Sequence, residues 1–97
     1  MHATVHVVAH FHAKVGQENA LKAVLVGLVA PTRRELGCYQ HDLLVNPDDP
    51  RDFCFVERWD GDKSVDQHLS TEHLKNAMAQ LESLVETPPE IHRYWIV

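Results

Sequence analysis

The apolar residues of this chain follow two different spacings, and the order in which these alternate constrains the fold. Residues 4–13 follow the two-residue period of a β-strand, with one apolar face made of Val5, Val7, Ala9 and Phe11. Residues 17–35 follow helical spacing, and Gly37 supplies a stop signal. Pro31 lies inside this helical pattern, so the helix either kinks there or ends and restarts; we expect a kinked helix.

The second half of the chain predicts two strands, two helices and a closing strand. These are strands at 38–45 and 52–59, a short helix at 62–69, a helix with Thr71 as its N-cap, and a strand at 91–97. Residues 46–50 have the composition of a turn, so the two central strands form an antiparallel hairpin. The order β-α-β-β-α-β predicts an α+β, ferredoxin-like fold: an antiparallel four-stranded sheet with helices on one face.

The other face of this sheet carries much apolar surface for a monomer. The positions expected on it or at its border are Val8, Cys54, Val56, Tyr94 and Ile96. An open sheet also has edges, which natural proteins cover. We therefore expect a homodimer that packs one open sheet face against the other.

Composition limits the classes of function. The 97 residues fit one domain, 1–97, and the 44% hydrophobic fraction is enough for a core. A net charge of −5 without a basic stripe argues against binding to nucleic acid or to an anionic membrane. The N-terminus lacks the basic region of a signal peptide, and Cys38 and Cys54 lack CxxC spacing. We expect two reduced thiols in a cytoplasmic protein.

Two runs of sequence resemble a known family. AHFHAKVGQENALKAVLVGLVAPTRRELGC is similar to the first half of the antibiotic biosynthesis monooxygenase (ABM) family, with its "F-x-A-K-x-G" and "P-T-R-x-E-x-G-C" patterns. DLLVNPDDPRDFCFVERWDGDKSVDQHLSTEHLKNAM is similar to the second half, with "F-x-x-x-E-x-W … H-L-x-T-x-H". The resemblance implies a dimeric α+β barrel. It also implies small cytoplasmic enzymes that oxidise quinols or polycyclic phenols with dioxygen and no metal or flavin cofactor.

Few of the family's functional residues carry over. Trp59 matches the tryptophan that lines the pocket in polyketide monooxygenases, but Phe55 and Val65 replace the asparagine and tyrosine used there. The haem-degrading branch needs a histidine where this chain has Met78, which argues against haem degradation. The wider superfamily also includes isomerases of small phosphorylated sugars.

Oxidation of a quinol without a cofactor needs a base, a dry pocket and oxyanion donors. We expect His68 as the base, with His41 as the second candidate. Glu57 shares strand parity with Phe55 and Trp59, and could act as a base, orient a histidine or be structural. Trp59, Phe55 and Tyr39 are the predicted walls of the substrate pocket.

Three alternatives remain at this stage. His10 and His12 share a strand face and could hold a metal ion with His6 behind them, but no third ligand lies at suitable spacing, so we expect no metal site. An isomerase of a small phosphorylated hydroxy-ketone would need a phosphate anchor, for which Arg33, Arg34 and Arg93 are the candidates. A dimeric binding or stress-response module would hold a hydrophobic ligand in a pocket without histidines.

Overall fold

The computed structural model describes residues 4–97, and the first three residues of the predicted domain lie outside this range. Four strands and three helices follow one another along the chain. They are β1 (Val5–His12), α1 (Glu18–Arg33), β2 (Cys38–Asn46), β3 (Asp49–Trp59), α2 (Asp62–Leu69), α3 (Glu72–Leu81) and β4 (Glu90–Tyr94).

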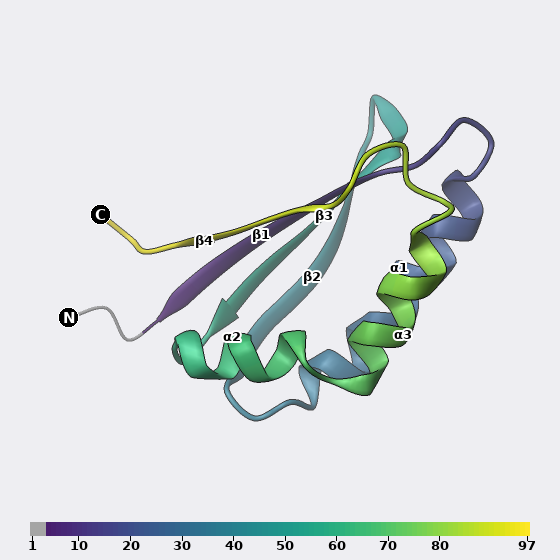
Figure 1. The fold of residues 1–97 in the computed structure, drawn as a ribbon. Helices are drawn as coiled ribbons and strands as arrows, with labels where there is room; N and C mark the ends of the chain where they lie inside the picture. Colours follow the sequence, from purple (N-terminus) through teal and green to yellow (C-terminus); the bar gives the residue numbers. More distant parts are fainter. Residues whose placement is uncertain (1–3) are drawn as a thin grey trace.

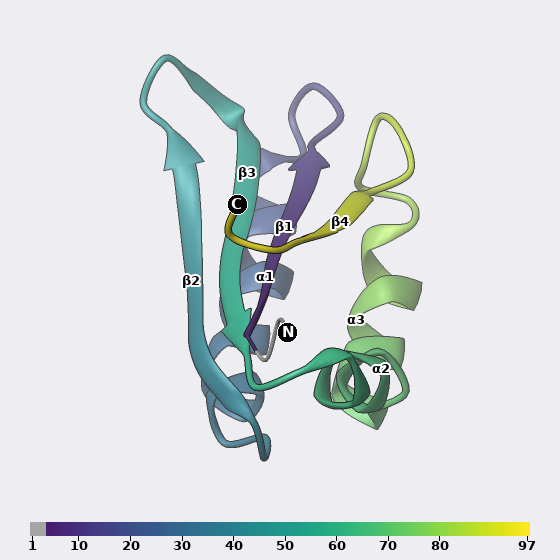
Figure 2. The ribbon, with the colours of Figure 1, turned by 90° about the vertical axis from the view of Figure 1, so that its left-hand side faces the viewer.

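The four strands form one antiparallel sheet in the order β2-β3-β1-β4. The helices lie on one side of this sheet, and its other side is uncovered (Figures 1 and 2). This arrangement confirms the predicted ferredoxin-like fold, with the helical part between β3 and β4 divided into α2 and α3.

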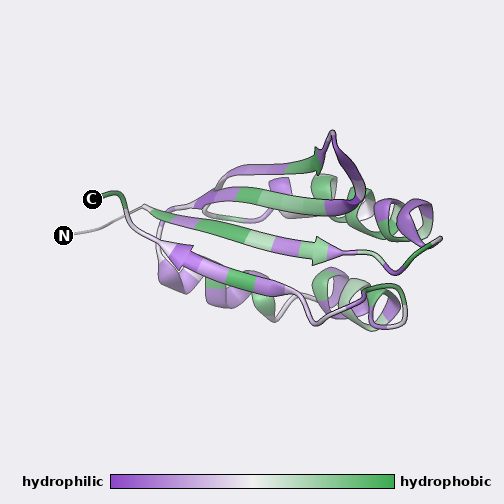
Figure 3. Cartoon of the chain, turned by 90° about the horizontal axis from the view of Figure 1, so that it is seen from above, coloured by the Kyte–Doolittle hydropathy of each residue, from purple (hydrophilic) through white to green (hydrophobic). Residues whose placement is uncertain are grey.

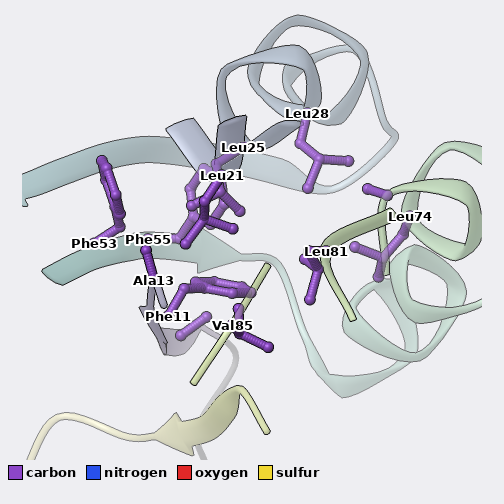
Figure 4. Close-up of a cluster of buried hydrophobic side chains, with 12 residues drawn as sticks. Phe11, Ala13, Leu21, Leu25, Leu28, Phe53, Phe55, Leu74, Leu81 and Val85 are labelled. Carbon is purple, nitrogen blue, oxygen red and sulfur yellow. The ribbon is translucent and has the colours of Figure 1, made fainter. Parts of the chain in front are cut away.

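The face of the sheet toward the helices forms the main core. Apolar and polar residues alternate along the strands (Figure 3), and the four predicted apolar residues of β1 are all buried. Phe11, Phe53 and Phe55 pack against Leu21 and Leu25 of α1 (Figure 4). A second, smaller cluster surrounds Trp59, which is fully buried.

The uncovered face of the sheet carries four of the five positions that the sequence predicted: Val8, Cys54, Val56 and Tyr94. The strand register places Val8 beside Val56 and His92, and it places Cys54 beside His10 and Leu44. Four apolar or aromatic side chains on this face or at its end are 48% exposed or more: Leu44, Tyr94, Trp95 and Ile96.

Several predicted boundaries were wrong. Helix α1 continues through Pro31 and ends at Arg33, two residues earlier than predicted. The hairpin turn contains only Pro47 and Asp48, since β2 extends to Asn46 and β3 begins at Asp49. Strand β4 ends at Tyr94, because its pairing with β1 ends at His6, so Ile96 lies beyond the sheet.

Gly37 fixes the turn between α1 and β2. Its φ of +87° lies in the left-handed region that glycine adopts without strain. A Cβ atom there would collide with the side chains of Ser64 and Asp60, so this turn packs directly against the start of α2. Within residues 4–97, none of the helices is long and apolar enough to span a lipid bilayer.

Candidate active site

A small cavity lies between the sheet and the helices. Its walls are mainly apolar, with Phe11 and Phe55 from the sheet, Leu28 from α1, and Leu74 and Met78 from α3. Three titratable side chains also line it: His41, Glu57 and His68. The volume open to the centres of water molecules is about 30 Å³, which exceeds the roughly 10–15 Å³ that one water requires.

Glu57 lies on β3 among the buried aromatic residues, as its strand parity predicted. Its side chain is buried, and its Oε1 accepts a 2.8 Å hydrogen bond from Trp59 Nε1. Burial raises the pKa of Glu57 to about 7, because desolvation outweighs the effect of the Trp59 hydrogen bond. A carboxyl group with this pKa is present in both protonation states at neutral pH, as acid/base catalysis requires.

His41 lies opposite Glu57 in the pairing of β2 with β3. Burial, with the nearby His68, lowers the pKa of His41 to about 3, so its imidazole is neutral at pH 7. Its Nε2 is 3.7 Å from Glu57 Oε2, which is too long for a hydrogen bond. Its Nδ1 is buried and has no hydrogen-bond partner in residues 4–97. Since an unsatisfied buried nitrogen is costly, a water or a ligand hydroxyl in the cavity would stabilise this arrangement.

His68 lies on α2 and is held by a carboxylate from a different part of the chain. Its Nδ1 donates a 2.7 Å hydrogen bond to Oε2 of Glu35, which lies in the turn after α1. The same oxygen accepts a 2.7 Å hydrogen bond from Nε2 of His73 on α3. The ring of His68 also packs on Trp59, with 4.8 Å between centroids. Burial lowers the pKa of His68, although Glu35 opposes this effect.

Among the six predicted site residues, four line the cavity: His41, Phe55, Glu57 and His68. Trp59 donates a hydrogen bond to Glu57 and packs on the ring of His68, but it does not line the cavity itself. Tyr39 lies two residues before His41 on β2, so regular alternation would place both on one face. Tyr39 is instead 59% exposed and does not line the cavity, because a register irregularity between Cys38 and Gln40 breaks this alternation.

The predicted phosphate anchors bind other partners. Arg33 donates hydrogen bonds to the backbone oxygen of His41 and to Asp42. Arg93 donates hydrogen bonds to Asp62 and Asp66. Neither arginine lines the cavity, and neither does Arg34, so the isomerase alternative finds no support in these contacts. Two histidines line the cavity, which also disfavours a purely apolar binding pocket.

The family model described as "Antibiotic biosynthesis monooxygenase" matches residues 4–80 of this chain. The chain belongs to the antibiotic biosynthesis monooxygenase family. The protein of Mycobacterium tuberculosis named "Putative monooxygenase Rv0793" is 33% identical over 88 residues, which are 91% of this chain and 86% of that protein. The family description and the name of this relative both refer to monooxygenase activity.

Two solved structures are similar over nearly the whole chain of this ABM protein. The crystal structure of PA3566 from Pseudomonas aeruginosa has a TM-score of 0.92 and 31% identity, and covers 100% of this chain and 97% of that chain. The structure of Rv0793 from M. tuberculosis has a TM-score of 0.91 and 29% identity, and covers 97% of this chain and 95% of that chain.

Glu35 was missed as a site residue of this ABM protein. It was read only as the end of a helix, although it is the glutamate of the "P-T-R-x-E-x-G-C" pattern. His73 lies in the first turn of α3, after the predicted N-cap Thr71, and its side chain also binds Glu35. The spacing of each motif was visible in the sequence, but the packing of the turn after α1 against α2 and α3 was not.

Proposed function

We propose that this ABM protein is a monooxygenase that oxidises a small quinol or phenol with dioxygen, without a flavin or metal cofactor. The observation that carries the proposal is a mainly apolar cavity that contains three acid/base groups, one of them fixed by a partly buried carboxylate. An apolar cavity with a few convergent polar groups is the usual form of a small-molecule site.

His68 is the proposed base. Its Nδ1 proton is committed to Glu35, so the neutral ring keeps a lone pair on Nε2 to accept a proton. A carboxylate that fixes the tautomer and orientation of a histidine serves the same purpose in other enzymes that use histidine as a base. Glu35 is therefore a positioning residue, and it takes the orienting role that the sequence analysis considered for Glu57.

His41, which is uncharged at pH 7, and Glu57, whose pKa is about 7, complete the proposed site. His68 removes a phenolic proton, and the phenolate transfers an electron to dioxygen; recombination of the radical pair forms a carbon–oxygen bond. Cleavage of the oxygen–oxygen bond then releases one oxygen atom as water, with Glu57 as a proton donor. For hydroquinone, the balance is one quinol and one dioxygen giving one hydroxyquinone and one water.

Substrate entry requires side chains to move, because a cavity of about 30 Å³ holds water and not an aromatic ring. Leu69 at the end of α2 is 40% exposed and Ile91 on β4 is 37% exposed, and both line the cavity. We propose that substrate enters between these two side chains. A smaller residue at either position would widen this entrance, and we expect it to lower KM for the quinol.

The proposed enzyme is a homodimer that pairs the uncovered sheet faces. The support for this proposal is the apolar surface on that face and at its end, namely Val8, Val56, Leu44, Tyr94 and Trp95. Burial of apolar surface provides about 25 cal/mol per Å², so a contact that covers this face would be favourable.

The test of the function is oxygen consumption by metal-free protein with a panel of hydroquinones and naphthoquinols. We expect activity in the native protein and a loss of about 10²- to 10⁴-fold in His68→Ala, the usual contribution of a catalytic base. His12→Ala, whose side chain binds Asp49 and Glu86 outside the cavity, is the matched control and keeps full activity. A panel left unoxidised by native protein would refute the proposal.

A further inference from the structure

We infer that Glu35, His68 and His73 form a site for one divalent first-row transition-metal ion, such as Zn²⁺. The sequence predicted no metal site, and this cluster does not involve the histidines of β1 that share a strand face. Glu35 comes from the turn after α1, His68 from α2 and His73 from α3. One ligand atom from each of these residues lies within 4.8 Å of the other two.

The donor set suits ions of this class. Two imidazole nitrogens and one carboxylate oxygen are three of the ligands that Zn²⁺ takes in catalytic sites, where a water fills the fourth position. Hard cations such as Mg²⁺ and Ca²⁺ prefer all-oxygen sites, so this set selects against them. One Glu and two His also avoid the repulsion between like charges that a purely acidic cluster carries.

The ligand atoms of the hydrogen-bonded cluster lie at distances close to those of a metal site. Glu35 Oε2 is 2.7 Å from His68 Nδ1 and 2.7 Å from His73 Nε2. Tetrahedral ligands with metal bonds of 2.0–2.1 Å are about 3.3 Å apart, so the two Glu35 pairs would each separate by well under 1 Å. The two imidazole nitrogens already lie within 4.8 Å of each other. The side chain of His73, which is 30% exposed, gives the ion access from solvent and has room to move.

Two neighbouring arrangements fit an ion less well. His41, Glu57 and His68 also lie close together, but all three are buried, and one oxygen of Glu57 is bonded to Trp59. His12 contacts two carboxylates, Asp49 and Glu86, through opposite nitrogens of its ring. A single ion cannot replace both of these contacts, which makes His12 a suitable control.

Metal binding would also act on the proposed base, a consequence that rests on the proposed function. An ion on His68 Nδ1 takes the place of the proton that this nitrogen shares with Glu35. The remaining ring proton is then on Nε2, and the ring can no longer accept a proton from a substrate. The ion would therefore inhibit the oxygenase reaction rather than support it.

The binding test uses tag-free protein that has been treated with EDTA and dialysed. We expect calorimetric titration with Zn²⁺ to give one ion per chain, and Co²⁺ to give the visible absorption bands of a tetrahedral complex. Glu35→Gln and His73→Gln each weaken binding at least tenfold, whereas His12→Gln leaves it unchanged. Far-UV circular dichroism checks that each variant is folded.

Each result decides between the two proposals. No Zn²⁺ binding, or binding that survives both substitutions and is lost in His12→Gln, overturns the metal site and leaves the oxygenase proposal intact. Stoichiometric binding at the three residues that leaves oxygen consumption unchanged supports the metal site and refutes His68 as the base.

Discussion

Replacing Glu57 by glutamine removes a buried ionisable group and keeps an oxygen that can accept the Trp59 hydrogen bond. Folding raises the pKa of Glu57 from 4.5 to about 7, so the folded protein holds this proton more tightly than the unfolded chain does. The stabilisation is fully present below pH 4.5 and is lost as the pH rises through 7, where a carboxylate must be buried. The difference between these two pKa values corresponds to about 3 kcal/mol of unfolding free energy.

The assay is urea denaturation of native protein and Glu57→Gln at pH 5 and pH 9, at one protein concentration. Titrations common to both proteins cancel in the difference between their unfolding free energies. We expect the unfolding free energy of Glu57→Gln, measured relative to that of native protein, to rise by about 2.5 kcal/mol between pH 5 and pH 9. A difference that stays constant with pH would show that Glu57 has an ordinary pKa, and would remove it as a near-neutral proton donor.

Three further substitutions test the fold and the assembly. Gly37→Ala should destabilise the protein by at least 1 kcal/mol more than Gly16→Ala. Both residues have positive φ, but only at Gly37 would an added Cβ collide with other atoms. Equal losses of thermal stability in the two variants would contradict this prediction. Thr71→Ala removes the N-cap hydrogen bond that the Leu74 backbone N–H donates to Thr71 Oγ1. This should lower the unfolding free energy measured with urea by about 1 kcal/mol, and an unchanged value would show that the cap contributes nothing. Val56→Asp, on the uncovered face, should convert the proposed dimer into a monomer in analytical ultracentrifugation, and an unchanged sedimentation coefficient would place the interface elsewhere.

The fold was predictable because its signals are local. The two-residue period of β1, the helical spacing of α1 and the turn composition between β2 and β3 each depend on residues close in sequence. The wrong predictions concern positions whose structure depends on pairing between strands that are far apart in the sequence. β4 ends at Tyr94 because its pairing with β1 ends at His6, and Tyr39 turns outward because of the irregularity at the start of β2.

The site was only partly predictable for a related reason. His68, Glu57 and His41 were recognised from their residue types and parity, but the partner of His68 comes from a turn 33 positions earlier in the chain. No periodicity connects Glu35 with His68 and His73. Their contact depends on the packing of the turn after α1 against α2 and α3, which only the folded structure provides.

The most direct test of the account is the fate of ¹⁸O₂. Metal-free native protein is incubated with hydroquinone substrates under ¹⁸O₂, and the products are analysed by mass spectrometry. We predict one ¹⁸O atom in the hydroxyquinone product from native protein, and about 10²- to 10⁴-fold less labelled product in the same time from His68→Ala. Product without ¹⁸O, or equal amounts of labelled product from the two proteins, would contradict a monooxygenase in which His68 is the base.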